Sequence, residues 1–248
     1  MSKIFLSIVI PAFNEAENFK KGCLDQVVEY LGKQKYTWEV ILVDDGSTDK
    51  TSILLPTFAK EKRGFRYFKI SHSGKLGAVK AGMMAAKGEY VLFTDFDQST
   101  SIKEVEKVLK EFKKGAEVVI ASRYEKGAER RNDSLPSWLR SVVFNWLVRL
   151  VLGLRIKDSQ CGFKAFKTPV AQELFGSLCA HQVKKIKKPF MGAFDLELLF
   201  IAQKRGLKIV SIPVIWYRVE SDKLRLGEPL QMLWALFKIR FYDLLGHY

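Results

Sequence analysis

The chain has 248 residues, of which 48% are hydrophobic, so it is long enough for one large folded domain with a substantial core. Its formal net charge of +14 at pH 7 favours an anionic partner: nucleic acid, a membrane surface or a phosphorylated small molecule. The three cysteines form no C-x-x-C pair, which argues against a disulfide framework or a zinc site and favours a reducing compartment. No window reaches the roughly 18 uncharged apolar residues that a membrane-spanning helix needs.

The first half of the chain alternates strand and helix patterns. Apolar runs rich in β-branched residues predict buried strands, and the stretches between them have helical character. We expect strands at residues 4–10, 38–43, 65–70, 90–94 and 117–121, and helices at 15–31, 49–62, 75–86 and 102–114. This β-α-β succession predicts an α/β fold with a mostly parallel central sheet flanked by helices, which binds ligands at the carboxyl ends of its strands.

The second half has a less regular pattern. Residues 134–154 suit one amphipathic helix or a pair of helices, and residues 158–167 read as a strand or a strand-like loop. A helix is expected at 194–206, a strand broken by Pro213 at 208–217, and an apolar helix at 229–245. Because no repeat or linker separates the halves, we expect a single domain over residues 1–248.

A polar turn, D-D-G-S at residues 44–47, follows the second predicted strand. An aspartate there can cap the next helix. At a ligand-binding edge, an acidic side chain can also accept hydrogen bonds from the base or ribose of a nucleotide. The G-x-G-x-x-G fingerprint is absent, which argues against an ordinary NAD-binding domain.

Two aspartates, Asp95 and Asp97, follow the fourth predicted strand in the motif T-D-F-D. In an extended chain, residues two apart point to the same side. Two carboxylates with an open face suit Mg²⁺ or Mn²⁺ held jointly with the phosphates of a ligand. The alternative, a solvated turn, loses weight because the other polar motifs end neighbouring strands of the same sheet.

The motifs of the first half together resemble glycosyltransferase family 2, whose members have the A-type nucleotide-sugar fold. They are S-I-V-I-P-A-F-N-E (7–15), V-D-D-G-S-T-D (43–49), G-K-L-G-A-V-K-A-G (74–82), T-D-F-D (94–97) and A-S-R-Y (121–124). In the second half, D-S-Q-C-G-F-K-A-F (158–166), F-D-L-E-L-L (194–199) and I-P-V-I-W (212–216) resemble the dolichyl- or polyprenyl-phosphate sugar synthases.

The motif Q-C-G-F-K is more similar to the glucosyl-phosphate members, which use UDP-glucose, than to the mannosyl members, which use GDP-mannose. The resemblance implies inverting, metal-dependent transfer of a hexose, glucose from UDP-glucose, to a polyprenyl or dolichyl phosphate. A GDP-mannose-dependent dolichyl-phosphate mannose synthase is the alternative. The resemblance makes residues 1–124 the nucleotide-sugar-binding half and residues 125–248 the acceptor-binding half.

The resemblance also implies roles for individual residues on the donor side. Asp45 contacts the uridine, and Asp95 and Asp97 hold the diphosphate through Mg²⁺ or Mn²⁺. The remaining donor-site residues implied by the resemblance are Pro11, Asn14, Glu15, Lys75, Gln160 and Gly162. The chain departs from the family pattern at Leu76, which replaces a glycine, and at Ser99, where mannosyl members place a metal-binding glutamine. Gln98 is one residue early and is not assigned to the metal.

On the acceptor side, the resemblance places Arg123 toward the acceptor phosphate, with Arg140 as a second phosphate-binding arginine. Each could instead be a solvated surface charge. Asp195 and Glu197 lie where relatives carry an acidic residue near the acceptor. An acceptor phosphate is already ionised at neutral pH and needs no strong base. A saccharide or protein hydroxyl acceptor, the rival hypothesis, would need one of these two carboxylates as a base.

Two segments, residues 134–154 and 229–245, mix Trp, Phe and Leu with Arg and Lys, as interfacial helices do. Together with the basic charge, they predict a cytoplasmic enzyme bound peripherally to the inner face of the cell membrane. A membrane protein as a partner would be compatible with this location. The alternative is that both segments are core helices. Nucleic acid is not expected as a partner, because the basic residues are scattered and no binding-module signature appears.

Overall fold

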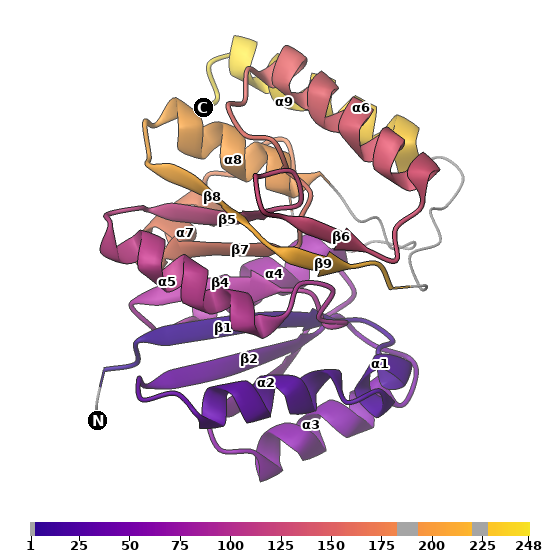
Figure 1. Ribbon diagram of the computed structural model, residues 1–248, viewed down its shortest axis with the longest axis vertical. Coiled ribbons are helices and arrows are strands. Elements are labelled where there is room, and N and C mark those ends of the chain that lie inside the picture. Colours follow the sequence, from indigo (N-terminus) through magenta and orange to yellow (C-terminus); the bar gives the residue numbers. More distant parts are fainter. Residues whose placement is uncertain (1–2, 183–192, 220–227) are drawn as a thin grey trace.

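The computed structural model of the protein describes residues 3–182, 193–219 and 228–248. A seven-stranded sheet in the order β3-β2-β1-β4-β7-β5-β8 crosses the molecule (Figure 1). Only β7 runs antiparallel to its two neighbours; the other paired strands of this sheet are parallel. The prediction of a mostly parallel α/β sheet is therefore confirmed. The strands are β1 (Leu6–Ala12), β2 (Trp38–Asp44), β3 (Phe65–Lys69), β4 (Tyr90–Thr94), β5 (Val118–Ser122), β7 (Phe163–Lys167) and β8 (Ile209–Pro213).

Helices bury both faces of this sheet in two apolar clusters. One face is covered by α2 (Cys23–Gly32), α3 (Thr51–Glu61) and α5 (Val105–Lys113). The other is covered by α4 (Gly74–Ala85), α7 (Thr168–Gly176) and α8 (Phe194–Lys204). Two further helices, α6 (Leu135–Leu152) and α9 (Glu228–Leu244), pack side by side on the outside of this second layer (Figure 1).

Two predicted elements differ in the structure, and two observed elements were not predicted. The helix expected at 15–31 is two helices, α1 (Ala16–Lys20) and α2, because Gly22 between them has a φ of 75° that ends the first. The strand expected at 208–217 divides after Pro213 into β8 and β9 (Ile215–Tyr217). β9 pairs with β6 (Glu129–Arg131) in a second, two-stranded sheet. The sequence patterns predicted neither β6 nor α7.

The strand registers bring the polar motifs to one edge of the sheet. Ala12 at the end of β1 pairs with Asp44, and Asp44 pairs in turn with Lys69. On the other side of β1, Thr94 at the end of β4 pairs with Phe163, which brings residues 158–162 to the same edge. The short 3-10 helix η1 (Ile102–Glu104) then leads from this edge into α5. Segments far apart in sequence thus surround one site.

Gly82, near the end of α4, allows this helix to pack closely against the sheet. A Cβ added at Gly82 would lie 2.3 Å from Val9 Cγ1 and 3.2 Å from Val43 Cγ2. Replacing Gly82 with alanine should therefore lower the free energy of unfolding by about 1–3 kcal/mol, as overpacking a core does. Urea unfolding measures the change. The control is Gly32→Ala at the end of α2, where nothing lies within 4 Å and stability should hold or rise. Equal stability of the two variants would contradict the prediction.

Candidate active site

The two aspartates after β4 lie on a turn. Both the backbone N–H and the side-chain amide of Gln98 donate to the carbonyl oxygen of Asp95, at 3.3 and 2.9 Å, and Gln98 has a φ of 54°. The expectation of an extended chain through residues 95–97 is therefore wrong. The charges of Asp95 and Asp97 nevertheless act on the same two neighbours, since both raise the pKa of Glu15 and the pKa of Lys75.

Each aspartate of the turn has a defined contact. The Asp97 carboxylate accepts hydrogen bonds from the backbone N–H and the hydroxyl of Ser99, at 2.9 and 2.8 Å. Ser99 therefore stabilises the turn where mannosyl members place a metal-binding glutamine. The Asp95 carboxylate forms an ion pair with Lys75 at 2.5 Å. Burial would lower the pKa of Lys75, but Asp95 and then Asp195 and Asp97 raise it above its ordinary value.

Gly162 leaves the space that the Asp95 carboxylate occupies. A Cβ built on Gly162 would stand 1.8 Å from Asp95 Oδ2 and 2.5 Å from its Cγ. No side chain larger than hydrogen fits there unless the carboxylate moves. The motif around Gly162, predicted to close the sugar side, thus contacts the predicted metal-binding pair directly.

The loop after β1 is tied to the loop after β2. Asn14, with a φ of 56°, accepts hydrogen bonds through Oδ1 from the backbone N–H groups of Thr48 and Asp49, at 2.9 and 3.3 Å. Its own N–H donates to Ser47 Oγ at 3.0 Å. Pro11 is buried within β1 and pairs with Val43.

Glu15 lies beside the acidic turn and carries a perturbed carboxyl group. Burial raises the pKa of Glu15 to about 7, and the neighbouring charges of Asp97, Asp95 and Asp49 act in the same direction. A hydrogen bond of 2.6 Å from the side-chain amide of Asn18 opposes them only in part. The side chain is thus a carboxyl that binding of a cation nearby would help to ionise.

Asp45 is buried at the end of β2 and its carboxylate has several internal partners. It accepts the backbone N–H groups of Ser73 and Gly74 at 2.7 and 2.9 Å, and Nδ1 of His72 lies 2.7 Å from Oδ2. His72 in turn stacks on Phe13, with ring centroids 4.3 Å apart. These contacts fix the start of α4. The assignment of Asp45 to the uridine stays a prediction.

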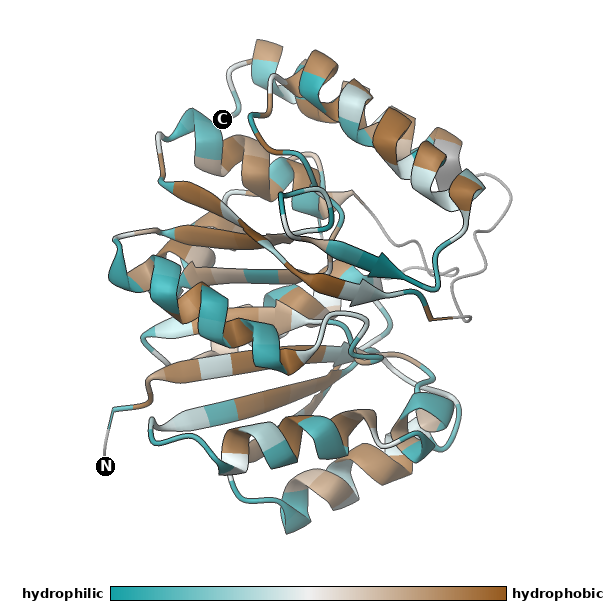
Figure 2. Cartoon of the chain, viewed as in Figure 1, coloured by the Kyte–Doolittle hydropathy of each residue, from teal (hydrophilic) through white to brown (hydrophobic). Residues whose placement is uncertain are grey.

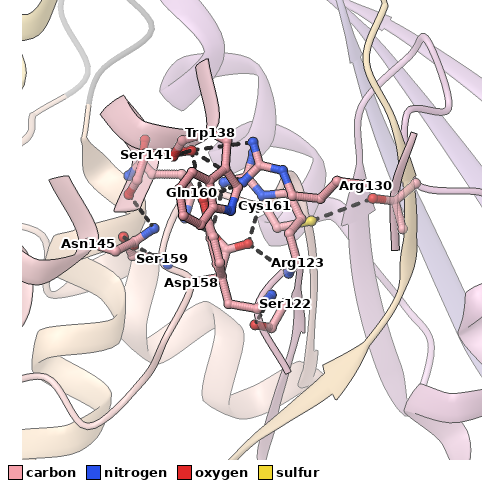
Figure 3. A network of polar contacts seen from close by, with 12 residues as sticks. Ser122, Arg123, Arg130, Trp138, Ser141, Asn145, Asp158, Ser159, Gln160 and Cys161 are labelled. Atoms are coloured by element: carbon pink, nitrogen blue, oxygen red, sulfur yellow. Dashed lines mark hydrogen bonds and ion pairs between the residues drawn. The ribbon is translucent and has the colours of Figure 1, made fainter. Parts of the chain in front are cut away.

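Arg123, at the end of β5, forms a bidentate ion pair with Asp158 (Figure 3). The two hydrogen bonds measure 2.7 and 2.9 Å, and the backbone N–H of Arg123 donates to the same carboxylate at 2.9 Å. Although burial acts against ionisation, Arg123 holds the pKa of Asp158 below its ordinary value. Asp158 also accepts the N–H of Gln160 at 3.1 Å. Arg123 therefore positions the 158–160 loop, and its role toward an acceptor phosphate stays a prediction.

Arg140 lies on the exposed side of α6, unlike the buried Arg123. A hydrogen bond of 2.7 Å between the Tyr124 hydroxyl and Ser141 Oγ nevertheless joins the residues that follow each arginine. Arg130 donates to the same tyrosine and serine. The end of β5 and the first turns of α6 are therefore joined by hydrogen bonds, and the phosphate-binding role of Arg140 remains a prediction.

The two acidic residues of α8 have different surroundings. Glu197 is fully buried and accepts five hydrogen bonds, from the backbone N–H groups of residues 179–181, the His181 ring and the Tyr248 hydroxyl. It has no free lone pair in a position to act as a base. Asp195 pairs at 2.6 Å with Lys164 of β7, and its charge acts on Lys75 at the acidic turn. Asp195 is therefore the one of the two that belongs to the site.

Two residues of the site were not predicted. Lys164 is fully buried in the middle of the sheet, and Asp158 is fully buried against Arg123. A lysine at an inward position of the alternating stretch F-K-A-F-K is a signal that could have identified Lys164. Nothing in the sequence connects Asp158 with an arginine 35 positions earlier.

Among the described residues, no group of three or more His, Cys, Asp or Glu is placed to hold a metal ion. The chain offers instead the two carboxylates of the acidic turn, Asp95 and Asp97, of which Asp97 is oriented by Ser99 through Oδ1. Mg²⁺ in phosphate-binding sites uses one or two protein carboxylates, with phosphate oxygens and water as the other ligands. The residues therefore fit a divalent cation shared with a diphosphate.

Comparison with known proteins agrees with this geometry. Residues 7–175 match the family described as Glycosyl transferase family 2. The chain is 34% identical to a dolichyl-phosphate β-glucosyltransferase of Saccharomyces cerevisiae, over 99% of this chain and 77% of that protein. It is 32% identical to one of Trichomonas vaginalis, over 97% of this chain and 72% of that protein. The protein is thus a glycosyltransferase. Within that class, the chain belongs to family 2.

Solved structures show the same fold. Mannosyl-3-phosphoglycerate synthase from Rubrobacter xylanophilus aligns with a TM-score of 0.66 at 16% identity, over 99% of this chain and 76% of that one. Glucosyl-3-phosphoglycerate synthase from Mycobacterium tuberculosis, solved with Mn²⁺, UDP and glucosyl-3-phosphoglycerate, gives 0.59 at 21% identity, over 98% and 80%. The predicted A-type glycosyltransferase fold is confirmed.

The raised pKa of Glu15 makes stability depend on pH. The folded protein holds a proton that the unfolded chain, with an ordinary pKa of 4.5, has released, so Glu15 lowers stability as pH rises from 4.5 to about 7. Glu15→Gln should therefore stabilise the metal-free protein at pH 8 by about 2 kcal/mol more than at pH 5. Denaturant unfolding in EDTA at both values measures this. Glu17→Gln, exposed on the same helix, is the control, and an equal effect of Glu15→Gln at both values would contradict the prediction.

Proposed function

We propose that the protein transfers glucose from UDP-glucose to a dolichyl or polyprenyl phosphate, with Mg²⁺ or Mn²⁺ and with inversion at the anomeric carbon. The supporting observation is the similarity to dolichyl-phosphate β-glucosyltransferases over almost the whole chain. The intact pair Asp95 and Asp97, of which Asp95 packs against Gly162 of the Q-C-G-F-K motif, adds a site of matching chemistry.

The proposed reaction is one displacement. An oxygen of the acceptor phosphate forms a bond to the anomeric carbon while the bond from that carbon to the diphosphate breaks, and UDP leaves. Asp95 and Asp97 would hold a divalent cation, which when bound neutralises charge on the departing diphosphate. Lys75 adds a positive charge near them. The chain's main task is to orient two anionic reactants in line.

No general base is required, because the acceptor phosphate is already ionised. The pairing of Asp195 with Lys164 and the saturation of Glu197 by hydrogen bonds agree with this. They give no support to the rival hypothesis of a hydroxyl acceptor, which needs a carboxylate free to take a proton. The exposed Arg140 on α6 marks the proposed place for the lipid phosphate.

The acceptor's lipid chain needs an apolar surface, and α6 and α9 provide one. No helix within the described ranges has the length and apolarity to span a bilayer. The two helices instead expose many large apolar side chains along their outer side, where hydrophobic segments alternate with polar ones (Figure 2). We propose that this face lies on the membrane surface. The exposed residues are Leu135, Trp138, Leu139, Val143, Trp146, Leu150, Leu230, Trp234, Phe237, Phe241, Leu244 and Leu245.

The donor is tested with a panel of UDP- and GDP-sugars, polyprenyl phosphate and Mg²⁺ or Mn²⁺, assayed for lipid-linked sugar. UDP-glucose should give product, and EDTA should abolish it. Gly162→Ala should lower turnover by about 100-fold, because a displacement of the Asp95 carboxylate by an ångström is enough to do so. Gly176→Ala, where nothing lies within 4 Å, is the matched control. Turnover of GDP-mannose with UDP-glucose inert would overturn the proposed donor.

Membrane attachment is tested by sedimentation with vesicles of phosphatidylcholine and phosphatidylglycerol at low salt. The wild-type protein should bind, and Trp234→Asp should weaken binding by about tenfold, since a buried large apolar side chain contributes about 1.5–3 kcal/mol. Ile53→Asp on α3 is the control, because Ile53 is 68% exposed and Trp234 71%, but only Trp234 lies on the proposed face. Equal loss in both variants, or no binding by wild type, would contradict the proposal.

A further inference from the structure

Four charged side chains gather on one face of the sheet beside the acidic turn. Gly162, against which Asp95 packs, is two residues before Lys164, and residues two apart in an extended chain point to the same face. Lys164 pairs across the sheet with Phe93, which is two residues before Asp95. Asp95 and Lys164 therefore belong to the same face.

The helices that cover this face supply the other two charges. Lys75 is near the start of α4 and Asp195 is near the start of α8. The ion pairs Lys75–Asp95 and Lys164–Asp195 measure 2.5 and 2.6 Å. The two pairs thus lie on the same face of the sheet, and the charge of Asp195 raises the pKa of Lys75. We call these four residues the charge quartet.

The two lysines of the quartet differ in how freely their side chains can move. The Lys164 side chain is fully buried, and its ammonium also donates to the carbonyl oxygen of Cys161 at 2.6 Å. Lys75 is 26% exposed, and Asp95 is its one ion-pair partner within the described residues. Lys75 can therefore move while Lys164 cannot.

One acceptor of the quartet is unused. Asp195 accepts from Lys164 through Oδ2, but its Oδ1 is buried and has no hydrogen-bond partner in the described part of the chain. A buried carboxylate oxygen without a donor is costly and calls for an explanation. A cation that reaches it in another state of the site is such an explanation.

We propose that Lys75 serves as the counter-ion of Asp95 while the metal is absent and moves to Asp195 Oδ1 when a divalent cation binds. The proposal rests on the metal site assigned above to Asp95 and Asp97. An ammonium and a divalent cation on the same carboxylate repel each other. Moving Lys75 to Asp195 relieves this repulsion and keeps the lysine paired. Lys75 would thereby reduce the repulsion among Asp95, Asp97 and Glu15 in the empty enzyme.

The test measures Mn²⁺ affinity by electron paramagnetic resonance without nucleotide, so that no phosphate competes for Lys75. Lys75→Met should bind Mn²⁺ about five- to tenfold more tightly than wild type, because the competing ion pair is gone. Lys80→Met, which removes the same charge from the same helix, is the control and should leave the affinity unchanged. Lys75→Gln keeps a polar tip and gives the same comparison if the methionine variant does not fold.

A double-mutant cycle tests the destination of Lys75. Asp195→Asn should weaken Mn²⁺ binding in the wild-type background, because the displaced lysine loses its acceptor, but not in the Lys75→Met background. An equal weakening in both backgrounds would show that Asp195 acts only through the electrostatic effect of its negative charge on Mn²⁺. This result would overturn the proposed movement of Lys75. Unchanged or weaker binding by Lys75→Met would overturn it as well.

The metal site itself has a separate control. Asp97→Asn should weaken Mn²⁺ binding strongly in both the wild-type and Lys75→Met backgrounds. If neither wild type nor Lys75→Met binds Mn²⁺, the metal site is wrong and the exchange fails with it. If wild type binds and Asp97→Asn does not, the metal site stands whatever the result at Lys75.

Discussion

The site depends on a balance of opposite charges at the carboxyl edge of the sheet. Asp95 can lie on an otherwise packed surface because Lys75 neutralises it and Gly162 leaves room for it. Arg123 and Asp158 form a second balanced pair at the end of β5. Removing one partner of such a pair leaves a poorly solvated charge, which is costly. The positions of these charges therefore constrain each other, and the loops that carry them are fixed together.

The antiparallel strand β7 makes this balance possible. It comes from the second half of the chain and inserts between β4 and β5, which come from the first half. The loop before it contributes Gly162 and Asp158, and the strand itself contributes Lys164. Because β7 runs opposite to its neighbours, its beginning lies at the carboxyl ends of β4 and β5. The proposed donor and acceptor sides consequently share one strand.

The outer helices α6 and α9 lie outside the layer of α4, α7 and α8 that covers the sheet. α6 and α9 pack on each other and contribute Val148, Leu236 and Ile239 to the core, yet they keep many apolar side chains outward. Patches of this size on a soluble surface commonly mark an interaction site. The N-terminal turns of α6 contact Tyr124, the neighbour of Arg123. The apolar lipid surface and the proposed acceptor side of the site would thus be continuous, as the proposed acceptor requires.

The sequence by itself determined the fold class, the strand-end motifs and the family. Hydrophobic periodicity and turn residues are local signals, and the runs at β1, β2 and β4 are buried on both faces as their composition indicates. The motif residues Asp95, Asp97 and Gly162 were assigned to one site before their contacts were visible. Local signals also misled, since the aspartates lie on a turn closed by Gln98 and not on an extended chain.

Only the tertiary structure decided which charges meet. Lys75 and Asp95 are partners, as are Lys164 and Asp195, while Glu197, two residues from Asp195, is instead saturated by the backbone of residues 179–181 and the Tyr248 hydroxyl. Such pairs depend on strand register and on which helix face covers the sheet. The spacing of residues along the chain encodes neither of them. Side chains that meet in the folded protein come from segments far apart in sequence, and only the pairing of strands and the placement of helices brings these segments together.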